Sequence, residues 1–158
     1  MKKFEFTGET KTISLFFRTA TLHRIRAVAE FGLVKIGDLG GWIEKEENLS
    51  HEGKAWVCGN AEVWGDAEVW GDAEVFSASH VLVIGAIGSR DDFTTFFRDK
   101  DNEITVKCGC FLGKIDKFLE KVTQTHGDSK YALVYRAAVE VARLQIDLLG
   151  EAPKDADE

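Results

Sequence analysis

A repeat of six residues in the middle of the chain constrains the fold more than any other feature. It runs through the segments Ala55–Asn60, Ala61–Asp66, Ala67–Asp72 and Ala73–Phe76, each with alanine first and valine two positions later. An α-helix cannot keep a six-residue period on one face, whereas alternate residues of a strand share a face. The repeat therefore predicts short strands with alanine and valine inside and with glutamate and tryptophan outside.

The Gly-Asn and Gly-Asp pairs between these segments predict corners, because both residue types tolerate positive φ. Three strands and three corners make one triangular coil of about 18 residues, and successive coils pair at about 4.8 Å. A looser continuation passes through Ser79, Val81, Gly85 and Ile87. We therefore expect a parallel β-helix of about three coils over residues 36–88.

The sequence around the repeat is similar to that of a known family. The segments Lys35–Glu44, Glu47–Ser50 and Gly53–Val57, together with Leu22–Ala27, resemble the front end of bacterial and phage-encoded proteins described as hexapeptide-repeat acyltransferases. The resemblance covers about the first half of the chain and implies a left-handed coil. It also implies a homotrimer packed about a three-fold axis, and an acyl-CoA-dependent transfer with a histidine as general base.

The fold class that we expect is mainly β: a short left-handed parallel β-helix with an N-terminal β cap, followed by a β-hairpin and two α-helices. Alternating apolar residues at Phe4, Phe6, Ile13, Leu15 and Phe17 predict two cap strands. The expected organisation is a cap over residues 1–32, the β-helix over 33–90, a hairpin over 91–112, two helices over 113–150, and a disordered acidic tail over 151–158.

The spacing of apolar residues predicts the two helices. The first has a stripe formed by Ile115, Phe118, Leu119 and Val122, and Gly127 is placed to end it. Asp128 is the candidate N-cap of the second helix. The predicted stripe of that helix comprises Val134, Ala137, Ala138, Val141, Leu144 and Leu148.

Composition limits the partners. The chain has 158 residues and a net charge of −7, which disfavours general nucleic-acid binding. No apolar run approaches the roughly 18 residues of a membrane span, and no leader peptide is visible. Three cysteines indicate free thiols in a reducing compartment, so we expect the cytoplasm of a bacterial host cell and no membrane partner. Cys108 and Cys110 would have only His126 as a third ligand, so no metal site is expected.

A polar segment after the repeat is the strongest candidate ligand site. Ser89, Arg90, Thr94 and Thr95 suit the recognition of a phosphate or carboxylate group, and Lys107 comes from a strand predicted to lie beside them. The alternative is that Ser89 and Arg90 cap strands or pair with neighbouring aspartates.

Trp56, Trp64 and Trp70 are predicted to point outward from the repeat. Exposed tryptophans are usually covered by a partner surface. We therefore expect at least one of them to lie in a subunit interface.

Three functions are compatible with these features. The first is a non-enzymatic protein that binds a small anionic, nucleotide-like ligand without a cofactor, which in a phage-derived protein would sequester a signalling molecule of host defence. The second is an acyl-CoA-dependent acyltransferase using His80 or His51, although a three-coil array is short for an extended CoA. The third is an inhibitor of a host protein that mimics nucleic acid with an acidic face made of Glu52, Glu62, Asp66, Glu68, Asp72 and Glu74.

Overall fold

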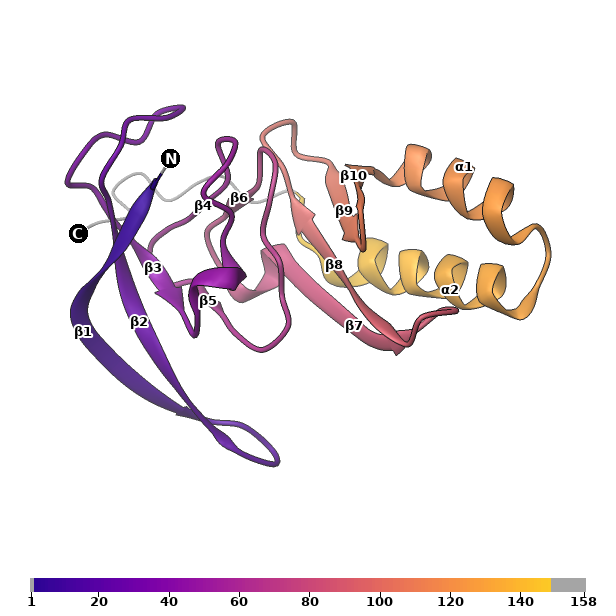
Figure 1. Ribbon diagram of the computed structural model, residues 1–158, viewed down its shortest axis with the longest axis horizontal. Helices are drawn as coiled ribbons and strands as arrows, with labels where there is room; N and C mark the ends of the chain where they lie inside the picture. The colour runs from indigo at the N-terminus through magenta and orange to yellow at the C-terminus, as the bar shows by residue number, and fades with distance from the viewer. Residues whose placement is uncertain (1, 149–158) are drawn as a thin grey trace.

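The computed structural model describes residues 2–148, and these are mainly β with two α-helices. Figure 1 shows three parts along the long axis: a long two-stranded arm, the repeat in the middle, and a sheet with two helices at the other end. The β-rich fold class with two C-terminal helices is therefore confirmed. The tail predicted over residues 151–158 lies outside the described residues.

The arm consists of β1 (Phe4–Ser14) and β2 (Thr19–Ala27), which pair antiparallel along their length. Two N-terminal strands were predicted, but a strand through Phe17 is wrong. The chain reverses at residues 15–18, where the Leu15 amide donates to the Arg18 carbonyl (2.7 Å). These four residues contain no Gly, Pro, Asn or Asp, so the usual signal of a turn is missing.

The repeat forms two stacked coils joined by parallel strand pairs. β3 (Leu39–Ile43) pairs with β5 (Glu62–Val63), and β4 (Trp56–Val57) pairs with β6 (Glu74–Val75). A parallel bridge between Leu49 and Val69 makes the third side. β2 also pairs antiparallel with β3, so the arm extends the first coil at its edge.

The interior of the coils follows the predicted six-residue period. The fully buried side chains are Ile43, Leu49, Val57, Val63, Val69 and Val75, and the alanines at 55, 61, 67 and 73 are at most 3% exposed. Gly65 and Gly71 turn corners at φ +66°, which is a conformation that glycine adopts without steric cost. A single 3-10 turn, η1 (Glu46–Asn48), lengthens one side of the first coil.

The predicted extent of the β-helix, residues 36–88, is wrong at both ends. Ile36 is 67% exposed and precedes the first coil. After Phe76 the chain enters a 3-10 turn, η2 (Ala78–His80), and then β7 (Val81–Ile87), which pairs antiparallel with β8 (Asp92–Arg98). The Gly-Asp corner pair is absent after Phe76, and the Ser77 hydroxyl instead accepts from the Ser79 amide (3.3 Å) and caps the 3-10 turn.

The second sheet is antiparallel, in the order β10-β9-β8-β7. β8 and β9 (Ile104–Cys108) form the predicted hairpin, and β10 (Phe111–Lys114) and β7 extend it on either side. Neighbouring residues of β8 face opposite sides: Phe97 packs in the core of the coils and Phe96 in the core under the helices. The sheet therefore separates two apolar cores.

The helices α1 (Ile115–His126) and α2 (Lys130–Gln145) cover the far side of this sheet. The stripe predicted for α1 is confirmed, and Gly127 ends the helix with φ +57°. The cap of α2 is Ser129 and not Asp128. The stripe predicted for α2 is right at Ala138, which is 4% exposed, but wrong at Val141 and Leu144, which are 47% and 88% exposed. The buried residues are Ala132, Tyr135, Ala138, Val139 and Ala142.

Candidate functional site

The structure divides the five predicted ligand-binding residues among three places. Thr94 and Thr95 are each 1% exposed, and as neighbours on β8 they face opposite sides of the sheet. Lys107 lies on β9 opposite Thr95. Ser89 and Arg90 are exposed in the turn between β7 and β8.

Thr95 and Lys107 fasten the sheet to the second coil. The Thr95 hydroxyl accepts a hydrogen bond from the Glu68 amide (3.0 Å). The Lys107 ammonium lies 3.2 Å from the Glu68 carboxylate and 4.7 Å from the centre of the Trp70 ring. It also donates to the Gly109 carbonyl. With these partners and 8% exposure, Lys107 has a structural role in joining the two parts.

Thr94 lies on the helix side of the sheet, near Tyr135, a residue for which no sequence pattern predicted a role. The Thr94 hydroxyl is 3.4 Å from Cys108 Sγ, and Cys108 in turn hydrogen-bonds Tyr135 of α2. Burial and the neighbouring Cys108 raise the pKa of Tyr135 to about 12. The Tyr135 hydroxyl presses against Gly88, where an added Cβ would lie only 1.9 Å away.

Arg90 sits where two turns meet at this end of the sheet. Its Nη1 atom is 3.9 Å from the position that a Cβ would take on Gly109, in the turn between β9 and β10. Its positive charge acts to lower the pKa of Tyr135, and the charge of Asp92 acts to raise it. Within residues 2–148 no carboxylate lies within ion-pair distance of this guanidinium. We refer to Gly88–Asp92, Gly109 and Tyr135 as the turn end.

Aromatic rings continue this end of the molecule along the helices. His126, the last residue of α1, stacks on Tyr135 with ring centres 5.8 Å apart. It also contacts Tyr131, at 5.7 Å between ring centres, and Tyr131 is 43% exposed. A cation and partly open aromatic rings therefore occur at the same end of the sheet and helix layers.

The acidic face predicted from the repeat is largely neutralised by the chain itself. Four lysines from four different segments pair with it: Lys11 with Glu62 (3.0 Å), Lys45 with Asp66 (3.7 Å), Lys100 with Asp72 (3.4 Å) and Lys107 with Glu68 (3.2 Å). A regular lattice of free carboxylates is therefore not what this face presents to a partner.

The two candidate catalytic histidines have structural partners. The Nδ1 atom of His51 accepts from the Lys3 amide (3.0 Å), and its ring stacks on Phe4 at 4.1 Å. The Nδ1 atom of His80 accepts from the Phe76 amide (3.0 Å), and this side chain is buried. Burial lowers the pKa of both, and for His80 the Arg98 guanidinium, 3.3 Å from Nε2, lowers it further.

Two of the three tryptophans predicted to point outward are covered by other parts of the same chain. Trp56 is 7% exposed, because Phe31 of the same chain packs against it edge-on at 5.3 Å. Trp70 lies under the Lys107 ammonium. Trp64 is 40% exposed and remains open to a partner.

Trp64 belongs to a cleft between the arm and the second sheet, with a volume of about 710 Å³. Phe17 and Arg18 approach it from the arm, Trp64 and its neighbours in the second coil form the floor, and Val81–Val83 with Phe93 form the opposite side. We call this the arm cleft. Neither candidate histidine lines it.

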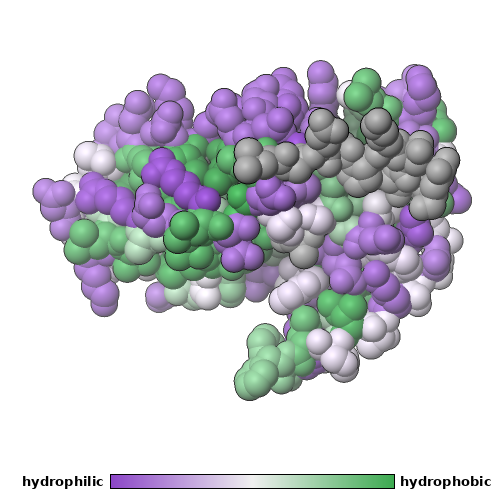
Figure 2. All heavy atoms as spheres, turned by 180° about the vertical axis from the view of Figure 1, so that it is seen from behind, coloured by the Kyte–Doolittle hydropathy of each residue, from purple (hydrophilic) through white to green (hydrophobic). Residues whose placement is uncertain are grey.

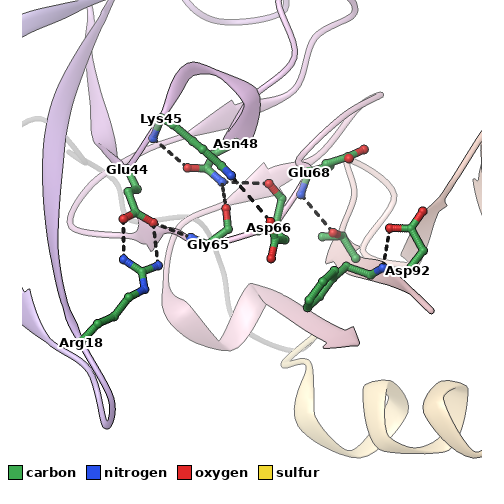
Figure 3. Close-up of polar contacts among 11 residues, drawn as sticks. Arg18, Glu44, Lys45, Asn48, Gly65, Asp66, Glu68 and Asp92 are labelled. Atoms are coloured by element: carbon green, nitrogen blue, oxygen red, sulfur yellow. Dashed lines mark hydrogen bonds and ion pairs between the residues drawn. The ribbon is translucent and has the colours of Figure 1, made fainter. Parts of the chain in front are cut away.

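Arg18 is held at the rim of the cleft by Glu44 (Figure 3). Two parallel contacts of 2.7 and 3.0 Å join the guanidinium to the carboxylate, which also accepts from the Gly65 amide (2.8 Å). These bonds lower the pKa of Glu44 to about 2, with the Arg18 hydrogen bond as the main cause. A smaller hollow of about 110 Å³ adjoins this region, and it is lined by Lys45, Glu47, Asp66, Ala67, Glu68, Asp92 and Phe93.

A fully satisfied carboxylate ties β8, β9 and β10 together. Asp99 is 2% exposed and accepts from the Thr105 hydroxyl (2.7 Å), Lys114 Nζ (3.0 Å) and two backbone amides. Burial alone would raise the pKa of Asp99, but these bonds outweigh it and the pKa lies below its ordinary value. Among residues 2–148 no group of three or more His, Cys, Asp or Glu side chains is arranged to hold a metal ion.

Comparison with models of known protein families gives no match to this chain, and comparison with curated proteins gives no significant relative. In the part of the chain that the structure describes, neither α-helix has the length and apolar character needed to cross a membrane.

Proposed function

We propose that the protein is a non-enzymatic binding protein that holds a small anionic, nucleotide-like ligand at the turn end. The observation that carries this proposal is the exposed Arg90 guanidinium without a carboxylate partner among the described residues, placed between two turns and beside the Tyr135 hydroxyl. A planar guanidinium with free N–H groups binds phosphate through paired hydrogen bonds.

The surroundings of Arg90 favour a ligand that carries both phosphate and an aromatic ring. Ser89 supplies a hydroxyl next to the cation. The nearby Asp92 carboxylate already accepts a hydrogen bond from the Phe93 amide (2.7 Å). Tyr131 offers a partly exposed ring on the same end, where a nucleobase would stack. Thr94, Thr95 and Lys107 would support the site from inside without contacting the ligand.

Isothermal titration calorimetry with ATP and with inorganic pyrophosphate tests this proposal. We expect ATP to bind more tightly than pyrophosphate, and Arg90→Gln to weaken binding about 10- to 100-fold, the loss of a hydrogen bond to a charged group. Arg143→Gln is the matched control, because Arg143 is also exposed but is paired with Glu140 (2.8 Å) and lies outside the turn end. Equal affinity of Arg90→Gln and the wild type would exclude Arg90 as the anion contact.

The sequence also leads to expectations about handedness, assembly and relatives. We propose that the coils are left-handed, that three copies associate, and that the chain is related to the hexapeptide-repeat proteins which it resembles. The parallel strand pairs and the buried alanine and valine positions support this relation. A phage-derived protein of this kind would sequester a signalling nucleotide of host defence in the bacterial cytoplasm.

A further inference from the structure

The end of the arm exposes two phenylalanines in succession. Phe16 is 103% exposed and Phe17 is 80% exposed, at the turn between β1 and β2. Figure 1 shows this end reaching well away from the rest of the molecule, and Figure 2 shows apolar atoms at the end of the projection. Adjacent, hydrated aromatic side chains at the end of a projecting hairpin are expected where a partner surface covers them.

The arm cleft offers an apolar surface of the right kind. Its walls include the half-open rings of Trp64 (40% exposed) and Phe93 (38% exposed), together with the side chains of Val81 and Val83 on β7. Phe17 of the same chain borders the cleft, but its 80% exposure means that it does not fill it. Each copy of the chain therefore has both an exposed aromatic hairpin end and an unfilled aromatic cleft.

Charge favours the same pairing. The end of the arm, residues 10–19, contains no acid and two bases, Lys11 and Arg18, which pair with Glu62 and Glu44 of the same chain. Residues 61–74, which form the floor of the cleft and its surroundings, contain no base and five acids: Glu62, Asp66, Glu68, Asp72 and Glu74. Lysines of the same chain pair with four of these five acids, Glu62, Asp66, Glu68 and Asp72, so a small acidic excess remains around the cleft. An apolar and basic occupant is thus preferred over an acidic one.

We propose that the end of the arm of a second copy of this chain docks in the arm cleft, with Phe16 lying between Trp64 and Phe93. Because every copy has one arm and one cleft, the contact either closes reciprocally between two copies or passes from copy to copy around a ring. Self-association through the arm covers the most exposed aromatic residues of the molecule. The cleft and the turn end adjoin at Asp92 and Phe93, but Arg90 and Tyr135 line neither the cleft nor the hollow beside it.

Sedimentation velocity of the full chain at micromolar concentrations tests the proposal. The wild type is expected to sediment as an oligomer, and the double variant Phe16→Ser/Phe17→Ser as a monomer, with a dissociation constant raised at least about a hundredfold. Leu33→Ser is the matched control, since Leu33 is 98% exposed and lies outside both the arm and the cleft. A monomeric wild type, or a double variant with the mass of the wild type, would overturn the proposal.

Photo-crosslinking shows which surface receives the arm, and it does not require a destabilising change. The substitution Phe16→p-benzoylphenylalanine keeps an aromatic side chain at the exposed position. Irradiation should give a crosslinked species of more than one chain on a denaturing gel, with residue 16 attached to peptides from residues 61–67 or 81–93. Crosslinks confined to single chains, or attached between chains to the outer face of α2, would refute docking in the cleft.

Discussion

Replacing Asn48 by alanine tests what holds the two coils in register. Asn48 is fully buried and bridges the first coil to the corner of the second. Its Nδ2 atom donates to the carbonyls of Gly65 (3.0 Å) and Ala67 (2.9 Å), and its Oδ1 atom accepts from the Lys45 amide (2.9 Å). One side chain therefore satisfies three backbone groups at a place where the repeat is interrupted by η1 (Figure 3).

The size of the effect follows from these three bonds. A typical intramolecular hydrogen bond contributes about 1 kcal/mol net, and a buried group left without a partner costs about 1–3 kcal/mol. Only the bond to the Ala67 carbonyl is buried at both ends, and water replaces part of the other two. We therefore expect Asn48→Ala to lower the free energy of unfolding by about 2–4 kcal/mol, a large share of the roughly 5–15 kcal/mol of an ordinary domain.

Urea unfolding followed by tryptophan fluorescence measures this loss. Asn48→Asp preserves the shape but turns an acceptor toward two carbonyl oxygens, so it should lose at least as much stability as the alanine variant. Asn60→Ala is the control, because Asn60 is an exposed corner residue and its replacement should change stability by less than about 0.5 kcal/mol. A loss below about 1 kcal/mol for Asn48→Ala, with an unchanged slope against urea, would show that these three bonds do not hold the coils in register.

Three further changes are expected to alter stability. Gly88→Ala should destabilise the fold by several kcal/mol in the same urea assay, because its Cβ would lie 1.9 Å from the Tyr135 hydroxyl at φ +78°. Arg18 lowers the pKa of Glu44 from 4.5 to about 2, so the stability that the Glu44 carboxylate contributes is present above pH 4.5 and is lost as the pH falls towards 2. In an acid titration, the difference in free energy of unfolding between the wild type and Glu44→Gln should shrink over that window. Burial lowers the pKa of Lys3 from 10.5 to about 8, so between pH 8 and 10.5 the unfolded chain binds more protons than the folded chain. The free energy of unfolding should therefore rise with pH over this range. Urea unfolding at a series of pH values should show this slope in the wild type and not in Lys3→Met.

The interior of the coils could be predicted from the sequence because the six-residue period assigns alanine and valine to the same face of each strand. With alanine and valine two residues apart in every hexapeptide, alternation places both inside, and Val63, Val69 and Val75 are buried accordingly. The end of the array could not be predicted in the same way. Val81 and Ile87 fit the spacing of the repeat, but the chain reverses at residues 88–91 and their segment pairs antiparallel with β8.

The prediction of the buried face of α2 was partly wrong for a different reason. Large aliphatic residues such as Val141 and Leu144 define a plausible apolar face, but both are exposed. The buried seam retains Ala138 of the predicted stripe and adds Ala132 and Ala142, and these short side chains let α2 lie close to its neighbours. The distance between α2 and the elements it packs against decides which face of α2 is buried, and the local sequence does not reveal that distance.

The structure brings only two of the five residues predicted for the ligand site, Ser89 and Arg90, together in one exposed turn. Thr94 and Thr95 are consecutive in a strand, so strand alternation alone was sufficient to assign them to opposite faces. No such signal was available for Tyr135, which is 45 residues from Arg90 in the sequence and reaches it only because α2 packs on the sheet. The neutralisation of the acidic face was equally hidden, because its four lysines come from outside the hexapeptides of residues 55–76.

The chain's own contacts restrict where a partner can bind. Trp56 is covered by Phe31, Trp70 by Lys107, and four of the outward carboxylates by lysines, so the coils present few free groups at their middle. What stays open lies at the periphery: the arm end with its cleft, and the turn end around Arg90. The two proposals are therefore separable. Arg90→Gln should change ligand affinity without changing the sedimenting mass. Phe16→Ser/Phe17→Ser should lower the sedimenting mass. If the resulting monomer still binds ATP, the turn end is complete within one chain.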